Sequence, residues 1–128
     1  MAKTIIETPN APAPIGPYSQ AVRVGDTVYI SGQIALDPAT GVLETNNLEA
    51  ETHRVMKNLG AILQAAGLDY THVVKCSIFL SDMGSFSRVN AVYGNYFGTQ
   101  PPARETVEVS VLPKQVNVEI SAIAVATA

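Results

Sequence analysis

Two apolar runs on either side of a turn dipeptide lie in the first third of the chain, which is a pattern of paired β-strands. Residues 20–24 and 27–33 are predicted as two strands that flank Gly25-Asp26, a dipeptide typical of a tight hairpin turn. A short strand at Ile5-Ile6 could precede them. The segment Asp37–Gly41 has the residue types of a turn, so we expect the second strand of the hairpin to end before it.

The hydrophobic spacing changes to that of a helix between residues 48 and 66. Side chains that would share one helical face recur there at steps of three and four residues. They are Leu48, Thr52, Val55, Leu59, Ile62, Leu63 and Ala66. Asn46 or Asn47 could cap the start of this helix, and Gly67 stands where a helix commonly ends.

The rest of the chain predicts three more strands and a second helix. The strands are residues 72–81, 104–111 and 116–126. The helix lies between the first two of these strands and carries a stripe of Phe86, Val89, Tyr93 and Phe97. Ser81 or Asp82 could cap its start, and Gly98 could mark its end.

The predicted order is strand-strand-strand-helix-strand-helix-strand-strand, which indicates an α+β fold. Strands outnumber helices, so the two helices could cover one face of a mixed sheet. The other face would still carry apolar side chains. We therefore expect a dimer or a trimer that buries this second face.

Composition and charge narrow the classes of function. The 128 residues are 47% hydrophobic and 15% charged, which fits one globular domain spanning residues 1–128. The net charge is −3 and the eight basic residues are scattered, so we expect no nucleic-acid partner. No apolar run approaches the roughly 20 residues of a membrane span, and the N-terminus has no signal-peptide core. These features predict a cytoplasmic protein without a membrane partner.

Most familiar catalytic signatures are missing from the sequence. There is no nucleophile elbow, P-loop, zinc-protease motif or dinucleotide fingerprint. His53 and His72 stand alone, and we expect His53 on the solvent side of its helix. Cys76, the single cysteine, falls on the apolar phase of its strand and excludes both an intrachain disulfide and a multi-cysteine metal site. The sequence thus predicts no metal, no cofactor and no covalent nucleophile.

Arg104 is the first candidate for ligand chemistry. It follows the stiff segment 100–103, which contains two prolines, and shares one face of its predicted strand with Thr106. An arginine at the mouth of a strand can bind a carboxylate through two parallel hydrogen bonds. The alternative is a surface ion pair with Glu105 or Glu108, and the pattern alone favours it.

Glu119 is the second candidate, because it stands between Val118 and Ile120 in an apolar strand. If it lines a pocket, burial would raise the pKa of its carboxyl and suit it to hold or activate water. If it lies on an exposed face of the strand, it has no such role, and the pattern alone favours this alternative too.

Three other positions could contact a ligand, each with a simpler structural explanation. Ser31-Gly32 could let a ligand approach the backbone, or form a bulge. Tyr18 could place a phenol at the rim of a pocket, or pack in a turn. Asn90 could donate to a ligand, or be a solvated helix residue.

Taken together, these segments resemble the reactive-intermediate deaminase (Rid, YjgF-like) family from about residue 3 to residue 126, in the order and at the spacing of that family. The matching stretches are Asn10-Ala11-Pro12, residues 15–20, residues 30–34, Asn58-Leu59, residues 65–68, residues 89–93, Pro102-Ala103-Arg104, Val107-Glu108-Val109, Leu112-Pro113 and Val118-Glu119-Ile120. No single tripeptide is specific, but the ordered set is strong evidence.

The resemblance implies a chorismate-mutase-like fold of the bacillus type and a homotrimer with three clefts between adjacent subunits. It implies hydrolysis of 2-imino acids, such as 2-iminobutanoate and 2-iminopropanoate released by pyridoxal-phosphate dehydratases, to 2-keto acids and ammonia. Arg104 would bind the substrate carboxylate and Glu119 would hold the attacking water. The remaining cleft residues implied are Tyr18, Ser31, Gly32, Asn90 and Thr106, drawn from two chains.

Two positions depart from the pattern of the family. Thr106 stands where many relatives carry a cysteine, and Ser121 stands where several carry a second glutamate. The contact at Thr106 is expected through the backbone, so the reaction should survive. Ser121 on the same strand face as Glu119 would change the polarity of the cleft and with it the substrate preference.

Three alternatives to the deaminase stay open. A non-catalytic module that binds small carboxylates such as 2-keto acids would also need Arg104. RNA cleavage fits poorly with an acidic chain that lacks a basic groove. Chorismate mutase activity would follow only from the similarity of folds, and its dianionic substrate would want more cations than Arg104 alone supplies.

Overall fold

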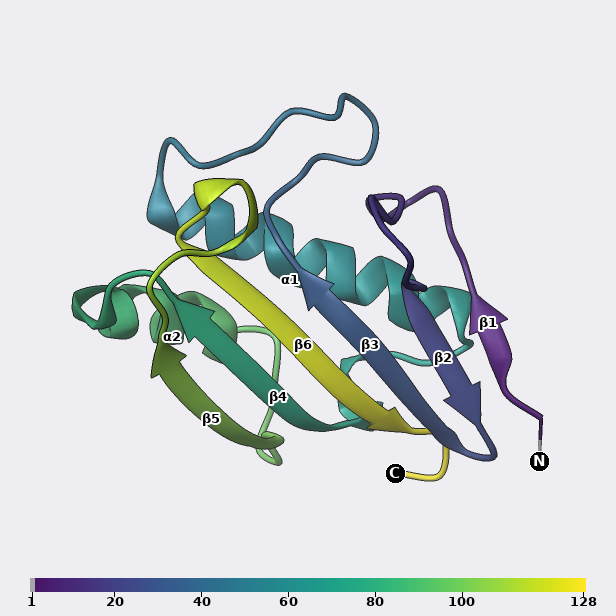
Figure 1. Ribbon diagram of the computed structural model, residues 1–128. Coiled ribbons are helices and arrows are strands. Elements are labelled where there is room, and N and C mark those ends of the chain that lie inside the picture. The colour runs from purple at the N-terminus through teal and green to yellow at the C-terminus, as the bar shows by residue number, and fades with distance from the viewer. Residues whose placement is uncertain (1) are drawn as a thin grey trace.

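The computed structural model describes residues 2–128 and contains one six-stranded sheet with two helices, both on the same face (Figure 1). Its main elements follow the predicted order and together make an α+β fold. They are β1 (Thr4–Ile6), β2 (Ala21–Val24), β3 (Thr27–Gln33), α1 (Leu48–Ala65), β4 (Val73–Leu80), α2 (Phe86–Gly94), β5 (Ala103–Glu108) and β6 (Val118–Val125). Three single 3₁₀ turns complete the chain: η1 (Tyr70–His72), η2 (Met83–Ser85) and η3 (Pro113–Gln115).

The strands lie in the order β1-β2-β3-β6-β4-β5. Only β4 and β5 run parallel, and the other neighbours are antiparallel. A parallel pair needs a crossover, and α2 provides it between β4 and β5. The hairpin predicted at Gly25-Asp26 joins β2 to β3, with Val24 opposite Thr27 and Gly25 at a φ of 59°. The sheet is therefore mixed, as the sequence pattern predicted.

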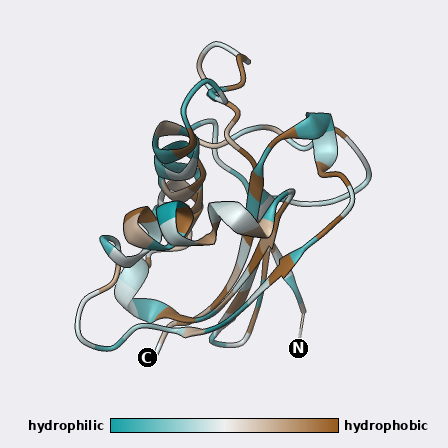
Figure 2. Ribbon diagram, turned by 90° about the vertical axis from the view of Figure 1, so that its left-hand side faces the viewer, coloured by the Kyte–Doolittle hydropathy of each residue, from teal (hydrophilic) through white to brown (hydrophobic). Residues whose placement is uncertain are grey.

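The core lies between the helices and one face of the sheet. The alternate residues Val118, Ile120, Ala122 and Ala124 of β6 are buried on this helix-covered face. Their neighbours on the sheet and the apolar stripe of α1 complete the core, including Val28, Ile30, Ile78, Leu80, Val55, Met56, Leu59, Ile62 and Leu63. Figure 2 shows the helices gathered on one side of the sheet.

The opposite face of the sheet, which we call the open face, has no helix over it (Figure 2). One row of laterally paired residues crosses it from β1 to β5: Ile5, Val22, Tyr29, Ile123, Lys75 and Ala103. Ile5 and Tyr29 keep 44% and 52% of their surface exposed. The expectation that one face retains apolar side chains is thus confirmed.

Local signals set the ends of α1. The Asn47 side chain accepts a hydrogen bond from the Ala50 backbone N–H at 2.9 Å. At the other end Gly67 takes a φ of 76°, and the Leu68 N–H donates to the Leu63 carbonyl at 2.8 Å. This is the glycine-terminated end that the sequence predicted.

The ends of α2 differ from the prediction. Asp82 caps the short turn η2 by accepting from the Gly84 N–H at 2.8 Å, and α2 itself starts after Ser85 without a side-chain cap. The helix ends at Gly94 and not at Gly98. Phe97 lies beyond the helix but still packs against Tyr93, with ring centroids 4.9 Å apart.

Several strand boundaries were also predicted too wide. The strand β4 begins at Val73, because Tyr70–His72 forms a capped 3₁₀ turn. The strand β5 stops at Glu108, and β6 starts at Val118 rather than at residue 116. The η3 turn between them contains two residues with positive φ, which no extended strand can accommodate.

A buried carboxylate ties α1 to the start of β6. Glu51 is completely buried and accepts hydrogen bonds from the Asn117 N–H and Nδ2, both at 2.8 Å, and from the Val118 N–H at 3.2 Å. Since Glu119 follows directly, this contact fixes the strand that carries one of the candidate site residues.

Between residues 2 and 128, no helix is both long and apolar enough to cross a membrane.

Candidate functional site

Arg104 stands near the start of β5, on the helix-covered face of the sheet beside Cys76. Its guanidinium donates to Oδ1 of Asn90 on α2. It also lies over two aromatic rings of α2, 5.4 Å from the centroid of Phe86 and 5.2 Å from that of Tyr93. The side chain is therefore held in place while the residue stays exposed, so the free edge of the guanidinium can still receive a carboxylate.

The surface ion pairs offered as the alternative for Arg104 do not form. Glu105 contacts Lys75 at 3.1 Å and accepts from the Ser77 hydroxyl on the open face. Glu108 accepts from the Met83 N–H at 2.7 Å. Asn90 proves to be an acceptor that orients Arg104, a role that sequence reasoning did not foresee.

Thr106 shares the helix-covered face with Arg104, as predicted, since Arg104 pairs with Cys76 and Thr106 pairs with Ile78. The Thr106 hydroxyl is buried and finds no hydrogen-bond partner within residues 2–128. Its backbone remains the part of the residue that a ligand at Arg104 could reach.

Glu119 lies on the open face, where it pairs laterally with Phe79. The residue is half-buried, and burial raises the pKa of its carboxyl above the ordinary value. Ser121 has the same orientation, because it pairs with Ser77 two positions along β4. Glu119 thus lies on the uncovered face of its strand without being fully exposed, and its shared face with Ser121 is confirmed.

Gly32 makes room for the Glu119 carboxylate. A Cβ atom at this position would lie 2.5 Å from Oε2 and 2.9 Å from Cδ of Glu119. The ladder between β3 and β6 shifts register between Ile30 and Gln33, so Ser31-Gly32 forms a bulge beside Ser121. The bulge, the simpler of the two explanations weighed for Gly32, is thus confirmed, and the glycine also makes room for the Glu119 side chain.

The Ser31 hydroxyl holds the loop that carries Tyr18. It donates to the Ser19 carbonyl at 2.6 Å, and the Ser31 N–H donates to the Gln20 carbonyl at 2.9 Å. Gln20 is buried and its amide bonds the backbone of the proline-rich segment at Thr8, Ala11 and Pro12. Tyr18 is left half exposed, at the rim of a small cavity that Gly32 also lines.

The predicted site residues fall into two groups on opposite faces of the sheet. Arg104, Asn90 and Thr106 form one half-site on the helix side, beneath α2. Tyr18, Ser31, Gly32 and Glu119 form the other half-site, along β3 and β6. Because the sheet separates them, one chain cannot bring Arg104 and Glu119 to the same small ligand.

The residues set aside at the sequence level have structural roles. The His53 ring is half-buried and its Nδ1 lies 2.6 Å from the Tyr96 hydroxyl, so its expected solvent-facing position is wrong. His72 belongs to the capped turn before β4 and accepts from the Asp69 N–H at 3.1 Å. Cys76 is buried, and burial raises the pKa of its thiol. Residues 2–128 place no three His, Cys, Asp or Glu side chains where they could hold one metal ion.

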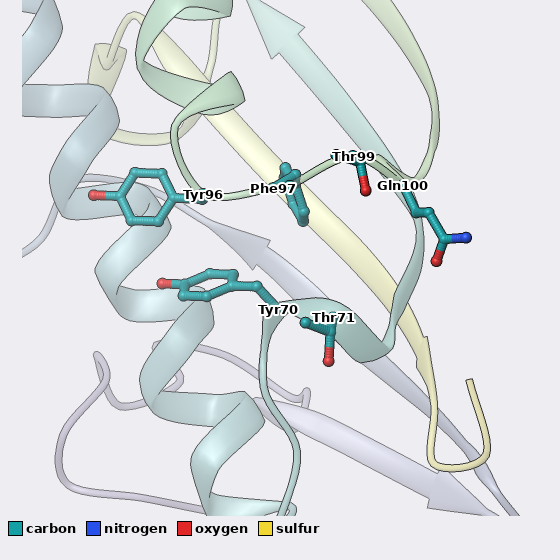
Figure 3. Close-up of a pocket in the computed structure, with 7 residues that line it drawn as sticks. Tyr70, Thr71, Tyr96, Phe97, Thr99 and Gln100 are labelled. Carbon is teal, nitrogen blue, oxygen red and sulfur yellow. The ribbon is translucent and has the colours of Figure 1, made fainter.

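A separate hollow of about 240 Å³ lies between η1 and the segment after α2 (Figure 3). Tyr70, Tyr96 and Phe97 line it, with Thr99 and Gln100 at its edge. The two tyrosine hydroxyls point away toward α1, where Tyr70 donates to the Met56 carbonyl at 2.6 Å and Tyr96 meets His53. No predicted site residue reaches this hollow.

Lys114 is the functional candidate that sequence reasoning missed. It lines the small cavity that Tyr18 and Gly32 also line, although it lies far from both in the sequence. The sequence signal next to it is Leu112-Pro113, which is one of the stretches that resemble the family but implies no role for Lys114.

Known proteins resemble this chain along almost its whole length. The family described as Endoribonuclease L-PSP matches residues 8–126. The protein DfrA of Myxococcus xanthus is 56% identical over 127 residues, which are 98% of this chain and 97% of the relative. The 2-iminobutanoate/2-iminopropanoate deaminase of Bos taurus is 50% identical over 125 residues, covering 98% and 91%. The crystal structure of the YjgF gene product of E. coli matches with a TM-score of 0.91 at 43% identity and covers 95% of this chain and 98% of that one.

The family match, over residues 8–126, extends through both half-sites. The architecture is that of the YjgF and L-PSP structures, a mixed sheet with two helices. The chain therefore belongs to the RidA family, which is also named for YjgF and L-PSP.

Proposed function

We propose that this protein is a homotrimeric hydrolase with a chorismate-mutase-like fold, which converts 2-imino acids such as 2-iminobutanoate and 2-iminopropanoate to 2-keto acids and ammonia. Each active site would combine the Arg104 half-site of one subunit with the Glu119 half-site of its neighbour. The observation that carries this proposal is the division of the site residues between two faces of the sheet. Only a second copy can complete the site.

The open face supports the assembly. Its cross-sheet row includes Ile5, Val22, Tyr29 and Ile123, and Val107 at its edge is 42% exposed. A face of this kind is stabilised when a partner removes it from water. Packing of this face against a neighbour would also cover the Glu119 side of the sheet and so enclose the completed site.

The reaction needs two contacts from the protein. Arg104 would bind the substrate carboxylate through two parallel hydrogen bonds, while Asn90 keeps the guanidinium oriented. Glu119 of the neighbour would hold a water against C2 of the imine. As the water oxygen bonds to C2, its proton passes to the Glu119 carboxylate and the C=N electron pair moves to nitrogen. That proton then goes to the nitrogen and gives the neutral carbinolamine. The proton of its hydroxyl next passes through Glu119 to the amine, so that ammonia leaves as the C=O bond forms.

Little further machinery is required, because imines already hydrolyse in water. Orientation of water and substrate supplies much of the rate that an enzyme must add. The raised pKa of the Glu119 carboxyl brings its basicity closer to that needed for proton exchange near neutral pH. Thr106 in place of the cysteine of many relatives leaves the backbone contact available, so the reaction is retained.

The names of the relatives support the reaction class without choosing the substrate. Mammalian proteins at about 50% identity are named for 2-iminobutanoate and 2-iminopropanoate, whereas others are named DfrA or RutC family. Among the differences within this family, the small Ser121 beside Glu119 makes the cleft less acidic than a second glutamate would. We propose that this cleft, in which Glu119 has no second glutamate beside it, repels an anionic substrate less than a cleft with two glutamates would.

A coupled assay tests the function. A threonine dehydratase generates 2-iminobutanoate in the presence of semicarbazide, and semicarbazone formation competes with hydrolysis. The wild-type protein is expected to suppress the semicarbazone, and Arg104→Ala is expected to lose this effect by a factor of at least about 100, since the carboxylate then has no charged partner.

Arg88→Ala serves as the matched control, because Arg88 is exposed and pairs only with Glu49 across the helices. Such a surface pair contributes little to stability. The deaminase is contradicted if wild-type protein leaves the semicarbazone unchanged with several amino-acid precursors. In that case the protein would be a non-catalytic module in which Arg104 binds small carboxylates.

A further inference from the structure

The turn η3 holds Lys114 in a conformation that its residue type does not favour. Lys114 and Gln115 have φ values of 54° and 57°, and non-glycine residues are disfavoured in this left-handed region, the more so two in succession. The buried side chains of Leu112 and Val116 anchor the turn on both sides. Such local strain persists where the surrounding structure enforces it, and it concentrates at functional sites.

The strained turn brings Lys114 to the small cavity of the Glu119 half-site. Tyr18 and Gly32 line this cavity, together with the apolar side chains of Ile15, Ile34 and Leu36. Of the residues that line it, Lys114 alone is charged. Residues 2–128 also offer its ammonium no ion pair within 4.0 Å. The cavity thus combines apolar side chains and the glutamines Gln20 and Gln33 with one unneutralised cation.

These features match a ligand with a short hydrocarbon stem that ends in an anion. We propose that Lys114 forms a second anion subsite, and that the protein hydrolyses imino acids with a distal carboxylate, of which 2-iminoglutarate is the simplest suitable probe. This inference rests on the proposed function. Arg104 of one subunit binds the carboxylate next to the imine, and Lys114 of the neighbour binds the distal one.

The subsite also solves an electrostatic problem of the Glu119 half-site. A second carboxylate on the substrate would be repelled by Glu119 unless a cation lies nearby. Lys114 provides that cation on the side of the cavity where Tyr18 and Gly32 lie. The hydrolysis itself is unchanged: water adds to C2, the C–N bond breaks, and ammonia leaves with both protons of the water.

The test compares two substrates on the full-length protein. Glutamate oxidase generates 2-iminoglutarate from glutamate, and an amino-acid oxidase generates 2-iminobutanoate from 2-aminobutyrate, with catalase present in both. The measured quantity is the protein concentration that halves semicarbazone formation. We expect wild-type protein to act on both substrates, and Lys114→Met to lower the ratio of its activity on 2-iminoglutarate to that on 2-iminobutanoate by about tenfold or more.

Two further variants complete the test. Lys114→Arg should restore the ratio, because it keeps the charge, and Lys57→Met removes an exposed lysine of α1 and should leave the ratio unchanged. The second subsite is overturned if the ratio is the same in wild type and Lys114→Met, or if wild-type protein hydrolyses 2-iminobutanoate but not 2-iminoglutarate. If wild-type protein hydrolyses neither, the proposed function fails, and this inference fails with it.

Discussion

At the scale of single residues, the contact between Gly32 and Glu119 leaves no room for a side chain at position 32. The bulge in β3 brings the backbone of Gly32 against the carboxylate, and no side chain fits between them. A residue with no side chain is therefore needed at this place for the position of the acid.

Substitution of Gly32 tests this dependence. In Gly32→Ala the new Cβ would lie 2.5 Å from Oε2 of Glu119, so the carboxylate must turn away. We expect the coupled assay to show a loss of turnover of about tenfold or more, since small displacements of a catalytic group are costly. Gly94→Ala is the control, because a Cβ there meets no atom within 4 Å. Equal activity of both variants would remove Glu119 from the mechanism.

The pH dependence of the reaction reports on Glu119 directly. Burial raises the pKa of its carboxyl, so the ionised form that accepts the water proton is lost at a higher pH than for an ordinary glutamate. As the pH falls through this raised pKa, the ratio of protein-accelerated to spontaneous hydrolysis should fall. Glu119→Gln should have a low ratio that does not depend on pH in this range. A wild-type profile as flat as that of the variant would contradict the assignment.

At the scale of elements, α1 does more than cover the sheet. Its buried Glu51 binds the backbone amides of Asn117 and Val118, the two residues directly before Glu119. The helix thereby sets the position of the strand that carries the acid, and fold stability and site geometry share one contact.

Removal of Glu51 should therefore destabilise the fold strongly. In Glu51→Ala the N–H groups of Asn117 and Val118 and the Asn117 amide lose their acceptor, which should lower the free energy of unfolding by about 3 kcal/mol or more. Urea unfolding measures the change. Glu49→Ala on the same helix breaks only a surface pair with Arg88 and should cost less than about 1 kcal/mol. Similar losses of unfolding free energy in both variants would show that the buried contacts of Glu51 stabilise the fold no more than a surface ion pair does.

The elements that the sequence predicts well are those with local signals. Asn47 and Gly67 bound α1 through contacts within a few residues, and the Gly25-Asp26 hairpin is equally local. The turn η3 was not predictable, because Lys114 and Gln115 adopt a conformation against their own preference. The end of β5 at Glu108 was not predictable either. The Val109 N–H still donates to the Leu80 carbonyl, so no break in the hydrogen bonding marks this end.

The candidate site was predictable only in part for a related reason. Alternation along a strand indicates which residues share a face, and this placed Thr106 with Arg104 and Ser121 with Glu119 correctly. It does not indicate which residues of two neighbouring strands point to the same side of the sheet. The opposite orientation of Arg104 and Glu119, and the bond from Arg104 to Asn90, depend on the pairing of β4 with both β5 and β6.

At the scale of the whole molecule, the sheet is a partition between two incomplete half-sites. Its helix-covered face is fully packed, while its open face presents a row from Ile5 to Ala103. A closed assembly with cyclic symmetry would use that face in every subunit and form as many complete sites as it has subunits. Catalysis and assembly would then depend on the same surface.

Complementation between two inactive variants tests this central claim most directly. Arg104→Ala and Glu119→Gln are produced separately and also co-expressed in equal amounts, and the coupled assay is run on each purified assembly. If every site takes Arg104 from one subunit and Glu119 from its neighbour, random mixing leaves about one quarter of the sites with both residues intact. The account therefore predicts about a quarter of wild-type activity in the mixture and almost none in either variant alone. A mixture no more active than its two components would contradict a site shared between subunits.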